Sequence, residues 1–277
     1  MSLSFVAVEA VSVTMFLLVL REAWRQGAHA VGTLLAGALF GLLIEVFFTT
    51  VYAGYTYGPF LLSVRGIPLW VALGWGTILW TSMQASDRLG APWYLRPITD
   101  GLLALSLDLT LDPVAEALGW WHWIRPGQFF GIPYDNFLGW IAIVSFYGLA
   151  VRAGFRWLPP GAHRARDALL PMAALLPAVL AVAGIQVVLE RLYRVAGEPL
   201  VFFGAASALL GLGVWSVPTS PAGSVRPWFV TAVPGAFHGL TLALLVLAGI
   251  GEAQPELYLV LPLAAIVSLI VFRSEPT

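Results

Sequence analysis

The chain has 277 residues, of which 59% are hydrophobic and 10% are charged, and its formal net charge is −1. A soluble domain carries roughly 25% charged residues, so this much apolar surface indicates a protein covered by lipid. The near-neutral charge argues against a nucleic-acid partner, because nucleic acids attract basic surfaces. The chain lacks cysteine and lysine, which excludes disulfides, thiolate sites and Schiff-base chemistry.

Apolar runs of membrane-spanning length, about 17–25 residues, recur along the chain. In chain order they are 3–20, 31–51, 67–84, 97–112, 137–151, 168–189, 199–217, 228–250 and 256–272. The fourth run is short. The pattern predicts an all-α polytopic transmembrane bundle of about nine spans, with a range of about seven to nine. No internal repeat is visible, so we predict one integral membrane domain over residues 1–277.

The arginines predict how this bundle is oriented. With nine spans, the loops on one side together with the C-terminal tail hold ten of the fourteen arginines, and the other side holds four. Positively charged residues favour the cytoplasmic side of a membrane. The N-terminus is therefore expected outside and the C-terminus in the cytoplasm, in a multi-pass protein of the inner or plasma membrane.

Acidic side chains interrupt two of the apolar runs. Glu45 lies in the second run, and Asp100, Asp108 and Asp112 lie in the fourth. An ionisable group at the bilayer centre costs at least about 3 kcal/mol on insertion scales, so such residues usually mark function. Helical rise places most of these groups in the outer half of the bundle, with His238 near mid-depth. The side chains that share this outer depth are Glu45, Asp108, Asp112 and Gln186.

Asp108 and Asp112 are four residues apart and therefore lie about 40° apart on one helix face. Two carboxylates so close in a low-dielectric environment do not both ionise readily, so one is expected to hold a proton. A neutral carboxylic acid can protonate an olefin, and its partner can position water or take the proton back. Asp108, Asp112 and Glu45 are the candidate catalytic residues. An interhelical hydrogen bond between Asp108 and Glu45 is the structural alternative.

Structural alternatives also stay open for other polar residues. Asp112 precedes Pro113, so it could instead cap the start of a short helix. Asp100 could cap a helix or pair with Arg96. His238 could be a hydrogen-bonded histidine of the bundle rather than part of a site.

Two loops on the predicted outer side, 51–66 and 118–136, are rich in aromatic residues and glycine. Aromatic residues there either anchor a protein at the headgroups or line the entrance for a long apolar ligand. We favour the entrance, because the glycines give these loops a shaped backbone that anchoring does not require. This predicts a narrow groove, open to lipid and polar only at its blind end near Asp108, with walls formed by Tyr55, Tyr57, Trp121 and Trp123.

The spacing of Asp108 and Asp112 superficially fits the magnesium–diphosphate motif of membrane prenyltransferases. Those enzymes carry a second Asp-rich motif, which is missing here. We therefore expect no metal site.

Two stretches resemble a known family: TVYAGYTYGPFLLSVRGIPLWVALGW at 50–75 and DGLLALSLDLTLDPVAEALGWWHWIRPGQFFGIPYDNFLGW at 100–140. The chain resembles the bacterial and archaeal carotenoid biosynthesis membrane proteins. Their characterised members are carotenoid 1,2-hydratases of the bisanhydrobacterioruberin and gamma-carotene hydratase type. The resemblance is strongest over 45–140, and the residues that carry it include Glu45, Tyr55, Tyr57, Asp108, Asp112, Trp121, Trp123 and Asn136.

This resemblance implies a hydro-lyase that hydrates the terminal 1,2 double bond of an acyclic or monocyclic carotenoid such as lycopene. Protonation at C-2 gives a tertiary cation at C-1, and water then adds to form a tertiary alcohol. Aromatic faces stabilise such a cation, and no cofactor is needed. The expected partners are a carotenoid from the bilayer, water and lipid. The predicted substrate-binding residues are Tyr55, Tyr57, Trp121, Trp123, Asn136 and His238.

The sequence is also compatible with two other functions. A membrane prenyltransferase or cyclase acting on isoprenoid chains is the alternative enzyme, and magnesium dependence would distinguish it. A transporter or lipid-binding protein with proton-relay carboxylates is the alternative without catalysis. Transporters often contain inverted repeats, and none is visible here.

Overall fold

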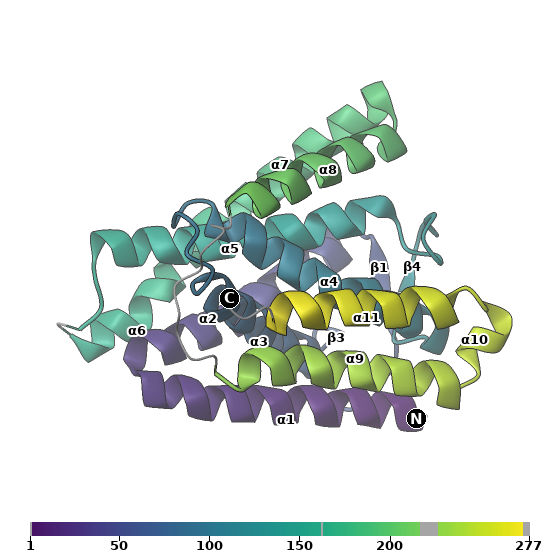
Figure 1. The fold of residues 1–277 in the computed structure, drawn as a ribbon, viewed down its shortest axis with the longest axis horizontal. Coiled ribbons are helices and arrows are strands. Elements are labelled where there is room, and N and C mark those ends of the chain that lie inside the picture. The colour runs from purple at the N-terminus through teal and green to yellow at the C-terminus, as the bar shows by residue number, and fades with distance from the viewer. Residues whose placement is uncertain (1, 162, 217–226, 274–277) are drawn as a thin grey trace.

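The computed structural model describes residues 2–161, 163–216 and 227–273, and most of this part of the chain is helical (Figure 1). The described helices are α1 (Leu3–Gln26), α2 (Ala28–Val46), the π-helical turn η1 (Phe47–Val51), α3 (Leu69–Ser86), α4 (Arg96–Leu118), α5 (Tyr134–Trp157), α6 (Arg164–Ala173), α7 (Leu175–Ala196), α8 (Glu198–Ser216), α9 (Phe229–Leu247), α10 (Ile250–Ala253) and α11 (Leu257–Arg273). The strands are β1 (Tyr55–Tyr57), β2 (Ser63–Val64), β3 (Ile67–Pro68) and β4 (Trp121–Trp123).

The apolar helices make this a membrane protein. Within the described ranges, six helical segments are long and apolar enough to cross a bilayer, namely α1, α2 with η1, α5, α6 with α7, α8 and α9. Each of the nine predicted runs overlaps a helix, but three of these helices, α3, α4 and α11, are not among the six. Charged side chains interrupt α4, and the described apolar part of α11 is shorter. The count of nine spans and the orientation stay predictions. Residues 217–226 and 274–277, which include most of the predicted loop 218–227 and of the predicted C-terminal tail, lie outside the described residues.

Helices α2, α3, α4 and α5 form the centre of the bundle. The closest helix pairs are α2 with α3 and α4 with α5, while α1, α9 and α11 pack against this group. Helices α7 and α8 form a hairpin that leans away from the other helices (Figure 1). The apolar core accordingly lies between the central helices and includes Leu34, Phe40, Leu79, Trp80, Val144 and Tyr147.

Small residues bring α2 and α3 unusually close. A Cβ atom at Gly41 would lie 2.3 Å from the Cβ atom of Trp75, and one at Gly76 would lie 2.8 Å from the carbonyl oxygen of Leu34. Glycine at such contacts lets two helix backbones approach in a membrane. Glu45 follows Gly41 by one helical turn, so this close packing brings its carboxylate against Trp75.

Within the described ranges, two short antiparallel sheets, β1 with β4 and β2 with β3, add to the all-α architecture. In the first sheet Tyr55 lies opposite Trp123 and Tyr57 opposite Trp121. Side chains alternate along a strand, so these four rings share one face, and the intervening residues of both strands are exposed. Glycine permits the close approach of loops 51–66 and 118–136, because a Cβ atom at Gly58 would lie 2.3 Å from the carbonyl oxygen of Gly119.

Helix α4 continues through Pro113, so the alternative that Asp112 caps a separate short helix is wrong. A proline inside a helix removes one backbone hydrogen bond, which neighbouring helices can compensate in a membrane protein. The helix ends at Gly119, which adopts the left-handed conformation at φ 70°. The continuity of α4 keeps Asp108 and Asp112 on one helix face.

Asp100 does not pair with Arg96, contrary to one of the alternatives. Its carboxylate accepts a hydrogen bond from Arg152 of α5 at 2.5 Å and another from the Ser86 hydroxyl, whereas Arg96 contacts Asp87 at 3.1 Å. Asp100 is buried, and the Arg152 side chain is only 9% exposed. The pair therefore ties α4 to α5 at the end of α4 remote from Asp112.

We expect Arg152→Met to destabilise the protein strongly, because it leaves Asp100 buried without a counter-charge. Breaking one side of a buried pair costs about 3–5 kcal/mol, whereas replacing both partners by apolar residues often costs little. Thermal unfolding in detergent should show a much lower melting temperature for Arg152→Met, and the melting temperature should recover when Asp100→Leu is added. Arg25→Met, in an exposed pair with Glu22, serves as the control. Equal thermal stability of the two single variants would contradict the expectation.

Candidate functional site

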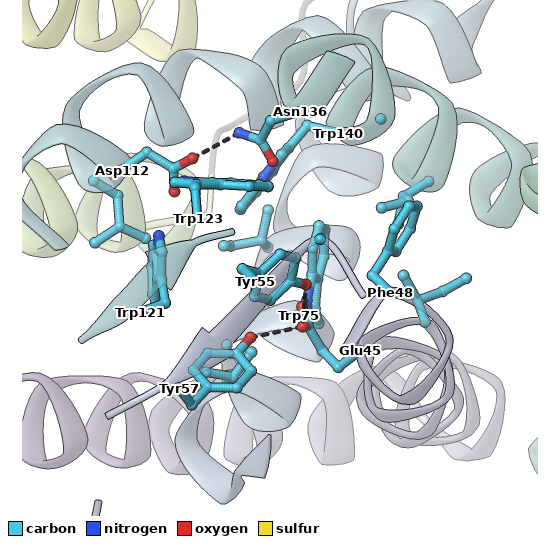
Figure 2. A pocket seen from close by; sticks show the side chains of 18 of the residues that line it. Glu45, Phe48, Tyr55, Tyr57, Trp75, Asp112, Trp121, Trp123, Asn136 and Trp140 are labelled. Carbon is cyan, nitrogen blue, oxygen red and sulfur yellow. Dashed lines mark hydrogen bonds between the residues drawn. The ribbon is translucent and has the colours of Figure 1, made fainter. Parts of the chain in front are cut away.

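A cavity lies between the β1–β4 sheet and helices α2, η1, α3, α4, α5, α7 and α9 (Figure 2). About 870 Å³ of empty space lies in and before it, and this volume includes space that is open to the surroundings. Most of its wall is apolar or aromatic, including Phe48, Trp70, Trp75, Trp121, Trp123, Trp140 and Phe237. Its polar wall residues are Glu45, Tyr52, Tyr55, Tyr57, Asp112, Asp135, Asn136 and Gln186.

Glu45 is held by three donors on the cavity wall (Figure 2). Its Oε2 accepts hydrogen bonds from the hydroxyls of Tyr55 at 2.5 Å and Tyr57 at 2.6 Å, and its Oε1 accepts one from Trp75 Nε1 at 2.7 Å. Burial, followed by the neighbouring Glu45, raises the pKa of both tyrosines well above the usual range, so their hydroxyls stay protonated. The indole N–H can only donate. This set of partners suits a carboxylate at position 45.

Asp108 and Asp112 are joined by one amide. Asn136, in the first turn of α5, donates from Nδ2 to Asp108 Oδ2 at 2.9 Å and to Asp112 Oδ2 at 2.6 Å. The two acids therefore set the orientation of the amide, and its oxygen points away from Asp112 (Figure 2). Asp112 lines the cavity, whereas Asp108 does not. The Oδ1 atom of Asp108 is buried and has no hydrogen-bond partner among the described residues.

The predicted aromatic residues gather on one side of the cavity. Tyr55 and Trp123 have ring centroids 4.9 Å apart, and Tyr57 and Trp121 have centroids 6.1 Å apart, both pairs edge to face. All four rings line the cavity rather than extend outward. This geometry is the one expected for an entrance rather than for simple anchoring. Trp75 was not among the predicted binding residues, although it completes the wall with Trp140 at a centroid distance of 4.3 Å.

His238 lies away from these groups. Its Nδ1 is 2.8 Å from the Thr110 hydroxyl, and it does not line the cavity. Thr110 is about 200° around α4 from Asp108, so a partner of Thr110 faces the opposite side of that helix. The structure therefore places His238 as a hydrogen-bonded histidine of the bundle, and its predicted contact with substrate has no support in this geometry.

A second polar group on the cavity wall was not predicted as a unit. The hydroxyl of Tyr52 donates to Asp135 Oδ2 at 3.1 Å, and burial together with Asp135 raises the pKa of Tyr52 to about 12. Gln186 of α7 lies on the same wall and interacts with Tyr52. The expectation of polar groups only at the blind end is therefore incomplete. The shared depth of Gln186 was visible in the sequence, but its neighbours were not.

No three histidine, cysteine, aspartate or glutamate side chains cluster as metal ligands within the residues that the structure describes. The cavity offers hydrogen-bonding carboxyl, amide and phenol groups beside aromatic faces. Such a site can bind an apolar chain and can donate a proton and a water molecule to one end of it.

Comparison with known proteins identifies the family. A family model described as "Carotenoid biosynthesis protein" matches residues 2–205. The chain belongs to this family. The membership confirms the resemblance inferred from 45–140 and extends it into α8.

Among curated proteins, the chain is similar to a bisanhydrobacterioruberin hydratase from Haloarcula japonica. The two are 31% identical over 175 residues, which covers 59% of this chain and 54% of the relative. The match thus spans about half the length of that curated relative. No solved structure matches the chain.

Proposed function

We propose that this member of the carotenoid biosynthesis family hydrates the terminal 1,2 double bond of an acyclic or monocyclic carotenoid end group. The observation that carries the proposal is one aromatic cavity lined by Asp112, which is one member of a carboxyl pair, and by Glu45, a separate carboxylate with three donors. The hydratase relative supports the same chemistry.

Asp112 is the proton donor in this proposal. It lines the cavity, and the nearby carboxyl group of Asp108 favours one proton on the pair, while the shared Asn136 amide holds the two side chains in place. The π electrons of the terminal double bond form a new C–H bond at C-2, and Asp112 is left as a carboxylate. Positive charge then develops at C-1.

Glu45 and the aromatic wall stabilise that cation. A carboxylate attracts the developing positive charge strongly in a water-poor cavity. The faces of Tyr55, Trp75 and Trp123 add cation–π stabilisation. The three donors to Glu45 hold its carboxylate in place, so little reorganisation is needed when the charge appears.

Water completes the reaction. Its oxygen forms a bond to C-1, and its surplus proton passes to the Asp112 carboxylate, which restores the neutral acid. The product is a tertiary alcohol, and the net change is the addition of one water without an oxidant or reductant. The substrate enters from the bilayer, because its long apolar chain would lose favourable burial in water.

Expression in a lycopene-producing host should convert part of the lycopene to a product heavier by one water at an end group. Mass spectrometry of the extracted pigments measures this gain, and a host that accumulates a monocyclic carotenoid provides the second substrate. Asp112→Asn, expressed to the same membrane level, is the negative control. Unchanged pigments in both hosts, with the protein correctly inserted, would contradict the proposed function.

A further inference from the structure

The second polar group is built from three separate elements. Tyr52 follows η1, Asp135 lies in the first turn of α5, and Gln186 is contributed by α7. Gln186 is 5% exposed, yet its side chain lies on the cavity wall. The reaction as proposed above assigns no step to these side chains. Tyr52 and Asp135 hydrogen-bond to each other, but a phenol, a carboxylate and an amide have more donor and acceptor sites than this one bond uses. All three side chains line a mostly apolar cavity, where a polar ligand would satisfy the remaining sites.

The position of this group suits water. Tyr52 and Asp135 are only partly buried, whereas Asp112 is 2% exposed, so the group lies nearer the surroundings than the acid. Asp135 precedes Asn136, whose amide contacts Asp112. Polar side chains therefore connect Tyr52, through Asp135 and Asn136 in the first turn of α5, to the carboxyl group of Asp112. An ordered water requires two to four polar partners, and this set provides them.

We propose that Tyr52, Asp135 and Gln186 form a water-binding subsite that supplies the nucleophile to the cation at C-1. The inference rests on the proposed hydration. With water in place, its oxygen bonds to C-1 and its surplus proton passes to the Asp112 carboxylate. Without water, that carboxylate removes a proton from C-2 or from a methyl group on C-1, and the alkene re-forms.

The cation is thus either captured by water or loses a proton, and the ratio of these two outcomes can be measured. A merely structural role of the three side chains would not change this ratio. The protein in lipid nanodiscs is incubated with carotenoid in D₂O, and both the alcohol formed and the deuterium in recovered carotenoid are quantified. In Tyr52→Phe and in Gln186→Met we expect hydration to fall by about tenfold or more. Deuterium exchange should persist, so the ratio of exchange to hydration should rise by a similar factor. Retained exchange also shows that the variant is folded and can protonate its substrate.

Tyr134→Phe is the matched control, because Tyr134 stacks on Phe202 at 4.6 Å and does not line the cavity. Its ratio should equal that of the wild type. Loss of hydration and exchange together in both Tyr52→Phe and Gln186→Met, or an unchanged ratio in both, would overturn the subsite. Wild-type protein that neither hydrates nor exchanges would instead refute the proposed hydration, on which the subsite depends.

Discussion

Replacing Asp112 by asparagine is expected to abolish hydration while leaving the protein folded. Asparagine has nearly the same shape as aspartate, and its amide oxygen can still accept the hydrogen bond from Asn136. It cannot donate a carboxylic proton to C-2. General acid catalysis contributes about 10²–10⁴-fold, so the rate of alcohol formation per inserted protein should fall by this factor.

Two further variants make that result specific. Asp108→Asn should lower the rate less than Asp112→Asn. Asp108 does not line the cavity, and in the proposal it only favours the protonated form of Asp112. Asp87→Asn changes a partly exposed aspartate that follows α3, contacts Arg96 and Arg152, and does not line the cavity. It keeps the pair of Arg152 with Asp100 and should retain activity. Normal hydration by Asp112→Asn would exclude Asp112 as the acid. A greater loss of rate in Asp108→Asn than in Asp112→Asn would instead identify Asp108 as the proton donor and Asp112 as its neighbour.

Glu45→Gln is expected to have the second largest effect. The substitution keeps the size of the side chain but removes the negative charge that faces the cation. Loss of one preorganised electrostatic contact typically costs about 10²–10³ in rate. Single-turnover formation of the alcohol, measured with saturating carotenoid, reports this loss separately from binding.

The partners of Glu45 and a remote glutamate test the interpretation. Tyr57→Phe removes one of three donors, so it should lower the rate by less than Glu45→Gln. Glu22→Gln alters an α1 residue that pairs with Arg25 and should leave hydration unchanged. If Glu45→Gln bound carotenoid and hydrated it at the normal rate, stabilisation of the cation by this carboxylate would be ruled out.

Several features of the site were predictable because they depend on local chemistry. Acidic residues are costly inside apolar runs, so their positions alone indicate Glu45, Asp108 and Asp112 as candidate site residues. Helical spacing placed the two aspartates on one face, and α4 confirms this because it continues through Pro113. Clustered rings and glycines in two loops indicated a shaped aromatic wall, which includes Trp121.

Other features could not be predicted because they depend on how one helix is rotated against its neighbours. Periodicity states where a side chain lies on its own helix, but not which neighbour it meets. For this reason His238, at a suitable depth, contacts Thr110 on the wrong side of α4. For the same reason Asp100 meets Arg152, a residue 52 positions away, rather than nearby Arg96.

The sequence by itself determined that the protein lies in a membrane, that it belongs with carotenoid biosynthesis proteins, and that Glu45, Asp108 and Asp112 are candidate site residues. Those conclusions follow from composition, short-range spacing and motif order. Only the tertiary structure decided that Asp112 rather than Asp108 lines the cavity, that Glu45 has three donors, and that Gln186 shares a wall with Tyr52. These are contacts between distant segments, and they are set by close helix packing and by the pairing of β1 with β4.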